Sequence, residues 1–386
     1  MFDERKEEAT PDASKSWISQ NLKGDKYIWA ISITILALSI PFVYSSSVQE
    51  AYRLRGGNTE YYLFKHLAHI VAALFIMFMV HLVPYTRFIR YTRIGVFITI
   101  PLLLLAVFAG SSVNDAARWI EIPIVGYRFQ PSEFAKIALI THLALVLARH
   151  IKGGWTPKEL LTEPIFLIAG ICFLIALSNV STAALLGAVS FMLLFVGKVP
   201  VRYLALAAGL LIAVAALAFT LKAGTRMGTA SNRIKSFMSE DDIPYQSERS
   251  YRAMAGGGVF GKGIGKSTER RFLPESNKDF IYAITVEEGG TVVGSILIFL
   301  YLALLYRGLQ VIKTARKPFG GLLSMGHTIG IVFQALCTMA VTVGLLPVTG
   351  QNLPLFSLGG NSMILTAVAM GMILSASRGE LDDVNV

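Results

Sequence analysis

A single aspartate, Asp279, stands directly before an apolar run that begins at Phe280. A carboxylate at the edge of an apolar region is partly desolvated, which raises its pKa toward the range that suits a general base. Asp is also a preferred N-cap residue, so Asp279 could instead cap a helix that starts at Phe280. Its position alone favours the cap, and both interpretations stay open.

Two more carboxylates, Glu287 and Glu288, follow a short way along the chain. We expect them to open a membrane span, because the positive end of the helix dipole favours carboxylates at a helix start. We also expect at least one of them to reach a polar interior.

A glycine-rich stretch, G-G-G-V-F-G-K-G-I-G-K-S, spans residues 256–267. Residues 256–261 fit G-x-G-x-x-G, but that pattern marks a dinucleotide site only between a strand and a helix, and no such unit is predicted here. The end of the stretch resembles a P-loop, but that motif needs glycine where Phe260 stands. Backbone N–H groups could still bind an anion such as phosphate, beside the positive charges of Lys262, Lys266, Arg270 and Arg271. The alternative is a flexible polar loop.

A third group of polar residues lies in F-Q-P-S-E-F-A-K at 129–136, preceded by Arg118. Pro131 suits the first turn of a helix. Glu133 and Lys136 would share one helix face and could pair. Ionisable residues in a membrane span are costly and suggest function. The alternative is a structural ion pair that holds two spans together.

A proline- and glycine-rich segment, G-L-L-P-V-T-G-Q-N-L-P, occupies residues 344–354 and leads into another apolar run. Irregular backbone at membrane depth is tolerated only where it lines a cavity or is buried in protein. Isolated polar residues inside other apolar runs are interpreted as hydrogen-bonding groups between helices: His142, His327 and Gln334.

The elements that must position these groups are membrane helices. Of the 386 residues, 54% are hydrophobic and 16% are charged, and mean hydropathy is +0.57, whereas soluble domains carry roughly 25% charged residues. Apolar runs of about 18 residues indicate membrane spans, and in lipid such runs must be helical. About ten spans are predicted, near 27–46, 66–83, 93–110, 131–149, 163–178, 180–197, 201–221, 287–306, 325–346 and 359–377. The fifth and sixth form a nearly continuous apolar stretch, which we interpret as a tight hairpin.

The distribution of Lys and Arg predicts the orientation. Basic residues alternate onto one side, which is therefore cytoplasmic together with both termini: Arg87, Arg90, Arg93, Arg149, Lys152, Lys158, Lys198, Arg202, Arg307, Lys313, Arg316 and Lys317. The net charge of +10 is thus explained by topology, and no nucleic-acid partner is expected. The loops near 47–65, 111–130, 222–287 and 347–358 face outward.

The predicted organisation is an all-α polytopic membrane protein with a single membrane domain at 23–380. Its one large extracytoplasmic loop, 222–287, lies between spans seven and eight, and residues 1–22 and 381–386 are cytoplasmic tails. No internal repeat is visible, so an inverted-repeat transporter is not supported. Cys172 and Cys337 fall inside apolar runs, so neither a disulfide nor a thiolate metal site is expected.

Four stretches, at 129–136, 256–267, 273–281 and 344–350, together resemble the SEDS family (shape, elongation, division and sporulation), the FtsW/RodA-type proteins. The resemblance runs from about Gly24 to Ser377. It implies a ten-span fold and a peptidoglycan glycosyltransferase that polymerises lipid II, with a polyprenyl-diphosphate glycan as donor, at the outer face of the cytoplasmic (inner) membrane. The entry stretch at 24–26 looks more like the division-type FtsW branch.

The resemblance also implies roles for particular residues and partners. The acidic residue of the family's L-P-E-S-x-x-D-F stretch is regarded as catalytic, and here it is Asp279. The expected substrate-binding residues are Glu133, Lys136, Arg118, Lys262, Lys266, Glu275, Ser276, Glu288 and Ser357. The implied partners are a class B penicillin-binding protein, a transpeptidase, and other divisome or elongasome membrane proteins; magnesium is the one cofactor that could take part. A lipid II transporter and a non-catalytic activator of the transpeptidase remain the alternatives.

Two stretches depart from the family's pattern. The usual P-D-L-G-T-A reads S-N-V-S-T-A here, so Asn179 stands where the family has Asp. Any metal-binding or electrostatic role of that Asp is therefore in doubt. The usual S-Y-G-G-S-S reads S-L-G-G-N-S at 357–362, which is a milder change.

Overall fold

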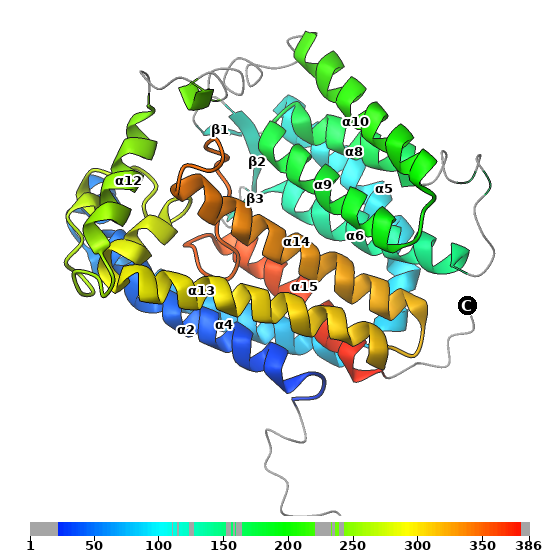
Figure 1. Cartoon of the computed structure of the whole chain (residues 1–386), viewed down its shortest axis with the longest axis horizontal. Helices are drawn as coiled ribbons and strands as arrows, with labels where there is room; N and C mark the ends of the chain where they lie inside the picture. Colours follow the sequence, from blue (N-terminus) through cyan, green and yellow to red (C-terminus); the bar gives the residue numbers. More distant parts are fainter. Residues whose placement is uncertain are drawn as a thin grey trace, which may run out of the picture.

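The computed structural model describes residues 22–109, 111–113, 116–122, 127–151, 156, 159, 164–220, 233, 236–238 and 243–379. Within these residues the fold is a bundle of helices that run in a roughly common direction (Figure 1). The helices are α2 (Lys26–Ser46), α3 (Val48–Arg55), α4 (Thr59–Leu82), α5 (Tyr85–Ala109), α6 (Pro131–His150), α8 (Phe166–Ala176), α9 (Val180–Val196), α10 (Val201–Thr220), α12 (Tyr245–Gly257), α13 (Ile281–Thr314), α14 (Pro318–Thr342) and α15 (Gly360–Arg378).

The helices bear out a polytopic α-helical membrane protein. Seven of those described are long and apolar enough to cross a bilayer, namely α2, α4, α5, α6, α13, α14 and α15. The shorter apolar helices α8, α9 and α10 coincide with the three other predicted spans. The count of ten and the side that each loop faces stay predictions. The predicted tails, apart from Leu22, and residue 380 lie outside the described residues.

The predicted break between the fifth and sixth spans is present. Helix α8 ends at Ala176, and α9 begins at Val180. Asn179 is the N-cap of α9, and its side-chain oxygen accepts a hydrogen bond from Thr182 N at 3.2 Å. Asn and Asp cap helices about equally well. The Asn that replaces the family's Asp therefore keeps this local role.

Several predicted boundaries are wrong because apolar runs mark the lipid-crossing part of a helix and not its ends. Helices α4 and α5 begin at Thr59 and Tyr85, before the predicted 66 and 93. Helix α13 begins at Ile281, so the large loop ends before the predicted 287. Its first residues are apolar but buried in protein: Ile281 and Ile284 have no exposed surface.

A small antiparallel sheet, absent from the prediction, connects α5 to α6. Its strands are β1 (Ser111–Val113), β2 (Ala116–Ile122) and β3 (Tyr127–Phe129), in the order β1-β2-β3. Glu121 pairs with Arg128 across β2 and β3, with Arg128 Nε 2.8 Å from Glu121 Oε1. The sheet lies at the same end of the bundle as α12 and the segment between α14 and α15 (Figure 1). Segments from three distant parts of the chain thus lie at one end of the bundle (Figure 1).

The glycine-rich stretch packs against a kink in α13. Gly290 has φ 74° and ψ 178°, which interrupts the helix. Lys262 N and Gly263 N donate to the carbonyl oxygens of Glu287 and Glu288, each at 2.9 Å, and Thr291 N donates to Gly258 O at 3.0 Å. The stretch is therefore an ordered partner of α13, and the interpretation as a flexible loop is wrong.

Replacing Gly290 with Ala should destabilise this junction strongly. A Cβ atom at Gly290 would lie 2.1 Å from Val259 O, and the backbone conformation is one that is nearly restricted to glycine. We expect a loss of at least about 1–3 kcal/mol from backbone strain alone, seen as a lower melting temperature of the purified protein. Gly209→Ala is the control, because nothing lies within 4 Å of its added Cβ. Equal melting temperatures of Gly290→Ala and Gly209→Ala would contradict the close packing of the glycine-rich stretch against the kink at Gly290.

Candidate active site

The turn that carries Asp279 is held on two sides. On one side it contacts the end of α2 and the start of α3: Ser276 Oγ donates to Ser46 O at 2.9 Å, and Asn277 Nδ2 donates to Glu50 Oε2 at 2.6 Å. These contacts place the predicted residue Ser276 in a structural role. They fix the backbone directly before Asp279, which a positioned catalytic group requires.

On the other side, the turn contacts the segment between α14 and α15. Ser357 Oγ donates to Lys278 O at 2.7 Å, and Leu358 N donates to Asn277 O at 2.9 Å. Ser357 Oγ also accepts a hydrogen bond from Leu353 N at 2.8 Å. Ser357, predicted to bind substrate, thus links two segments that lie far apart in the sequence.

Lys278 adds positive charge beside Asp279. Its Nζ lies 2.6 Å from Glu275 Oε2 and 3.7 Å from Glu50 Oε1. Burial opposes the charged form, but the two carboxylates outweigh this and raise the pKa of Lys278 above its usual value. The predicted substrate-binding residue Glu275 is thus an ion-pair partner of Lys278.

Asp279 is half-buried and faces Gly350 and Arg233. A Cβ atom at Gly350 would lie 3.6 Å from Asp279 Oδ2 and 4.0 Å from Arg233 Nη1, so both groups lie against the same backbone. Burial lowers the pKa of Arg233, and the charge of Asp279 partly offsets this. The N-cap of α13 is Phe280, so the interpretation of Asp279 as the N-cap residue is wrong.

A cavity of about 330 Å³ opens beside Arg233, and Asp279 is not among the described residues that line it. Its lining joins α12 to the segment after α14, and includes Arg233, Gln246, Tyr251, Pro347 and Val348. Arg233 Nη1 donates to Val348 O at 3.0 Å, which holds the guanidinium at the cavity wall. The volume lies within the range of small-molecule pockets, about 300–1,000 Å³. Sequence reasoning missed Arg233, because a lone Arg in a long polar loop carries no spacing signal.

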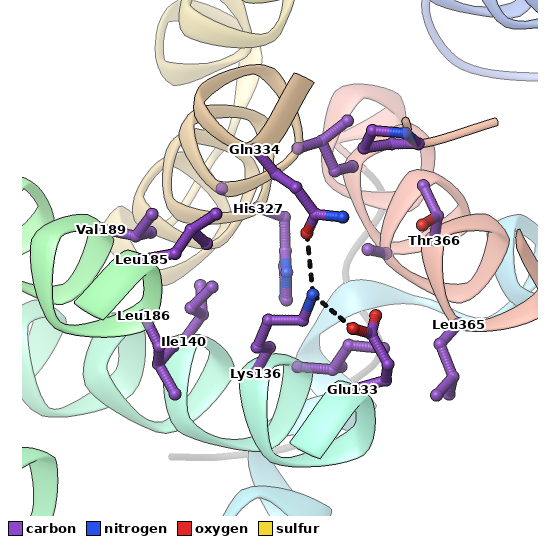
Figure 2. A pocket seen from close by; sticks show the side chains of 15 residues that line it. Glu133, Lys136, Ile140, Leu185, Leu186, Val189, His327, Gln334, Leu365 and Thr366 are labelled. Carbon is purple, nitrogen blue, oxygen red and sulfur yellow. Dashed lines mark hydrogen bonds and ion pairs between the residues drawn. The ribbon is translucent and has the colours of Figure 1, made fainter. Parts of the chain in front are cut away.

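Glu133 and Lys136 form a second buried group, at the first turns of α6. Lys136 Nζ lies 2.8 Å from Glu133 Oε1 and donates to Gln334 Oε1 of α14 at 2.8 Å, as Figure 2 shows. They line a cavity of only about 40 Å³ together with apolar side chains from α9 and α15. The ion pair is therefore within one helix, and it is Gln334 that carries the contact across to another helix.

The two groups are joined by one segment and do not share a cavity. Gln334 Nε2 donates to Asn352 O at 2.9 Å, while Gly350 lies against Asp279. Among the residues described, the lining of the small cavity does not include Asp279. Residues 350–352 therefore lie between Asp279 and the pair of Glu133 with Lys136.

Glu287 is fully buried and accepts a dense set of hydrogen bonds. Lys262 Nζ lies 2.6 Å from its Oε1, Thr268 N donates to the same oxygen at 2.9 Å, and Ser267 Oγ donates to Oε2. Glu288 is also buried and accepts from Ser45 Oγ and from Ser267 N. Both carboxylates reach a polar interior, as expected.

These contacts correct two predictions. Glu287 and Glu288 do not open a helix, because α13 begins at Ile281 and kinks after them. The glycine-rich backbone does not form an anion site at Lys262 and Gly263, since those N–H groups donate to carbonyls of α13. Lys262 and Glu288, predicted to bind substrate, are therefore parts of a buried structural network.

The remaining predicted residues take different places. Lys266 is exposed on the glycine-rich stretch. Arg118 lies in β2, and its side chain is outside the described residues. Within the described part of the chain there is no group of three or more His, Cys, Asp or Glu that could hold a metal ion. Asp279 has cations beside it, so these side chains do not fit a protein-held magnesium site.

The comparisons with known proteins agree with this architecture. A profile of the FtsW, RodA and SpoVE cell cycle proteins matches residues 25–381. The chain belongs to the FtsW/RodA/SpoVE family. Among curated relatives, the "probable peptidoglycan glycosyltransferase FtsW" of Geobacter sulfurreducens is 29% identical over 364 residues, covering 92% of this chain and 95% of the relative. The protein of that name from Bacillus subtilis is 29% identical over 382 residues, covering 93% and 92%.

Solved structures show the same fold. A chain from a structure described as "structural coordination of polymerization and crosslinking by a peptidoglycan synthase complex" superposes with a TM-score of 0.73 at 24% identity, covering 92% of this chain and 98% of that one. RodA of Thermus thermophilus, a rod shape determining protein, gives a TM-score of 0.67 at 23% identity, covering 93% and 98%. The SEDS-type bundle expected from the motifs is confirmed.

Proposed function

We propose that this family member is a peptidoglycan glycosyltransferase that polymerises lipid II into glycan strands during cell division. Membership in the family and relatives named FtsW at 29% identity over most of the chain support this assignment. The observation that carries the chemistry is the position of Asp279. Its carboxylate is half-buried on a fixed turn and lies near Arg233, and it is Arg233 that lines the cavity.

In the proposed reaction Asp279 is the general base. The carboxylate takes the proton from the 4-hydroxyl of the acceptor sugar while that oxygen bonds to the anomeric carbon of the donor. The bond from the anomeric carbon to the diphosphate breaks, and the diphosphate leaves with the electron pair. One base suffices, because a diphosphate leaves without needing a proton from an acid. Attack from the face opposite the diphosphate inverts the anomeric centre.

The charge that develops on the leaving diphosphate needs fixed cations. Arg233 supplies a guanidinium at the cavity wall, and Lys278 adds a second cation near Asp279. Lys262 is committed to Glu287, and Lys136 to Glu133. Lys278 is likewise paired with Glu275 and Glu50, so the contacts favour Arg233 over the three lysines as the partner of the diphosphate. A magnesium ion would depend on ligands from the substrate itself, and no step above requires it.

A lipid II transporter is the alternative of a different class. It would need a polar path across the bundle, centred on Glu133 and Lys136. The cavity at these residues has a volume of about 40 Å³, room for roughly three water molecules and far too little for a disaccharide head group. The geometry therefore favours the polymerase.

Purified protein mixed with lipid II in detergent would test the assignment. A detergent micelle does not separate two aqueous compartments, so transport cannot occur. Only a polymerase can form glycan chains under these conditions. We expect a ladder of glycan products on a gel, each of which migrates more slowly than monomeric lipid II. Lipid II that stays monomeric, also after a transpeptidase partner is added, would leave the transporter or the activator as the function.

The same assay can measure the role of Arg233. Arg233→Gln should lower the rate of polymerisation about 10²-fold, because it removes one preorganised cation from the charge that develops on the diphosphate. Arg233→Lys keeps the charge and should retain more activity, although it loses the bidentate geometry of the guanidinium. Equal rates for the wild type and Arg233→Gln would exclude this role.

The cellular setting belongs to the proposal as well. We infer that the large loop and Asp279 face outward, that both termini are cytoplasmic and that the protein lies in the cytoplasmic membrane. We also infer that a class B penicillin-binding protein, together with other division proteins, is its partner. The likeness in fold to a chain of a synthase complex that couples polymerisation and crosslinking supports this partner. Copurification of the two full-length membrane proteins would test it.

A further inference from the structure

Three apolar side chains project from the glycine-rich stretch, and the proposed chemistry does not use them. Val259, Phe260 and Ile264, here called the apolar tip, are 57%, 84% and 59% exposed. Single exposed apolar residues are normal on protein surfaces. Three of them within a few residues, including an almost fully exposed Phe, form a patch that calls for a partner.

The backbone of the apolar tip is hydrogen-bonded to α13. Lys262 N and Gly263 N, which lie between Phe260 and Ile264, donate to carbonyl oxygens of α13. The Lys262 side chain is paired with the buried Glu287 at 2.6 Å. The backbone of this segment is ordered by the fold, so binding of the three side chains would not require a further loss of its conformational entropy.

A backbone hydrogen bond shows where the apolar tip lies along α13. Val292 N donates to Val259 O at 3.2 Å, so the tip begins level with Val292. From there α13 carries an exposed apolar stripe of one helical face: Val292, Ile296, Phe299, Leu302 and Tyr306. In a helix long and apolar enough to cross a bilayer, such a stripe faces lipid. The apolar tip thus lies at the level along α13 where this exposed stripe begins.

Basic side chains accompany the apolar tip in the sequence. Lys266, in the glycine-rich stretch, and Arg271, a few residues after it, are both exposed. An apolar group flanked by Lys and Arg is typical of segments that lie at the boundary of head groups and acyl chains, where the cations meet anionic lipid.

We propose that the apolar tip inserts into the bilayer leaflet around this end of α13, with Lys266 and Arg271 contacting anionic head groups. The tip then anchors the segment 256–271 at the membrane surface. Because this segment interlocks with α13, the anchor sets the height of the bundle end relative to the lipid head groups. The inference rests on the fold and not on the proposed reaction.

Fluorescence quenching in nanodiscs would test this. The emission of an indole added by Phe260→Trp is obtained as the difference from the wild-type protein, in lipid with or without bromine near the acyl-chain carbonyls. Glu121→Trp is the matched control, because Glu121 is a polar, exposed position in β2. We expect bromolipid to quench the indole at position 260 at least about twofold more than that at position 121, and aqueous iodide to show the reverse order.

Two further variants complete the design. Ile264→Trp repeats the measurement if Phe260→Trp lowers the melting temperature. Lys266→Gln with Arg271→Gln should abolish any gain in bromolipid quenching that anionic lipid produces. Quenching at position 260 by iodide and not by bromolipid would overturn the proposal, because the tip would be in water. Quenching by neither would also overturn it, because protein would cover the tip. Either failure could occur while polymerisation of lipid II is normal.

Discussion

Replacing Asp279 with Asn should lower the rate of lipid II polymerisation by about 10²–10⁴-fold, the usual contribution of a positioned general base. Asn keeps the shape of Asp but cannot accept the proton from the acceptor hydroxyl. The turn should stay folded, since it is held through Ser276, Asn277 and the backbone of Lys278. Gel analysis of glycan products from purified protein gives the rate, and melting temperature reports the fold.

Glu121→Gln is the control for Asp279→Asn. Glu121 is an exposed carboxylate of β2 that pairs with Arg128. Because it lies outside the turn that carries Asp279, the change should leave the rate within a small factor of the wild type. A wild-type rate for Asp279→Asn would show that Asp279 is not the base. If that variant also bound the transpeptidase and supported crosslinking, the protein would act as an activator and not as a polymerase.

Lys136→Met should be the most destabilising of the proposed changes. It removes the ammonium that lies 2.8 Å from Glu133 Oε1 and leaves a carboxylate buried without its charge partner. Breaking a buried ion pair from one side costs about 3–5 kcal/mol. It also removes the hydrogen bond to Gln334, which connects α6 to α14. We expect a large drop in melting temperature in detergent.

The double variant Glu133→Gln with Lys136→Met tests whether the unpaired carboxylate of Glu133 causes the loss of stability. Because it leaves no unpaired buried charge, it should recover much of the stability lost in Lys136→Met. Equal melting temperatures of the single and double variants would mean that the pair is not coupled. The activity of the stable double variant then tells whether the pair also serves catalysis.

The class of the protein follows from its apolar runs. Backbone groups in lipid must be bonded within the segment, so long apolar runs can only be helices, and each predicted span coincides with an apolar helix of the structure. The motifs sufficed for the family, which the profile confirms over residues 25–381. The ion pair of Glu133 with Lys136 was also predictable, because residues three apart meet on one helix face.

The partners of the polar side chains depend on how distant segments of the chain pack. Lys262 and Glu288 looked like site residues, but their partners, Glu287 and Ser45, come from other elements. Arg233 had no motif, yet it lies against the same backbone as Asp279. Spacing along the sequence predicts contacts within one helix, but it does not predict contacts between residues of distant segments. Local patterns therefore gave the helices and the family, whereas the partner of each charge depended on how the helices and the outer segments pack together.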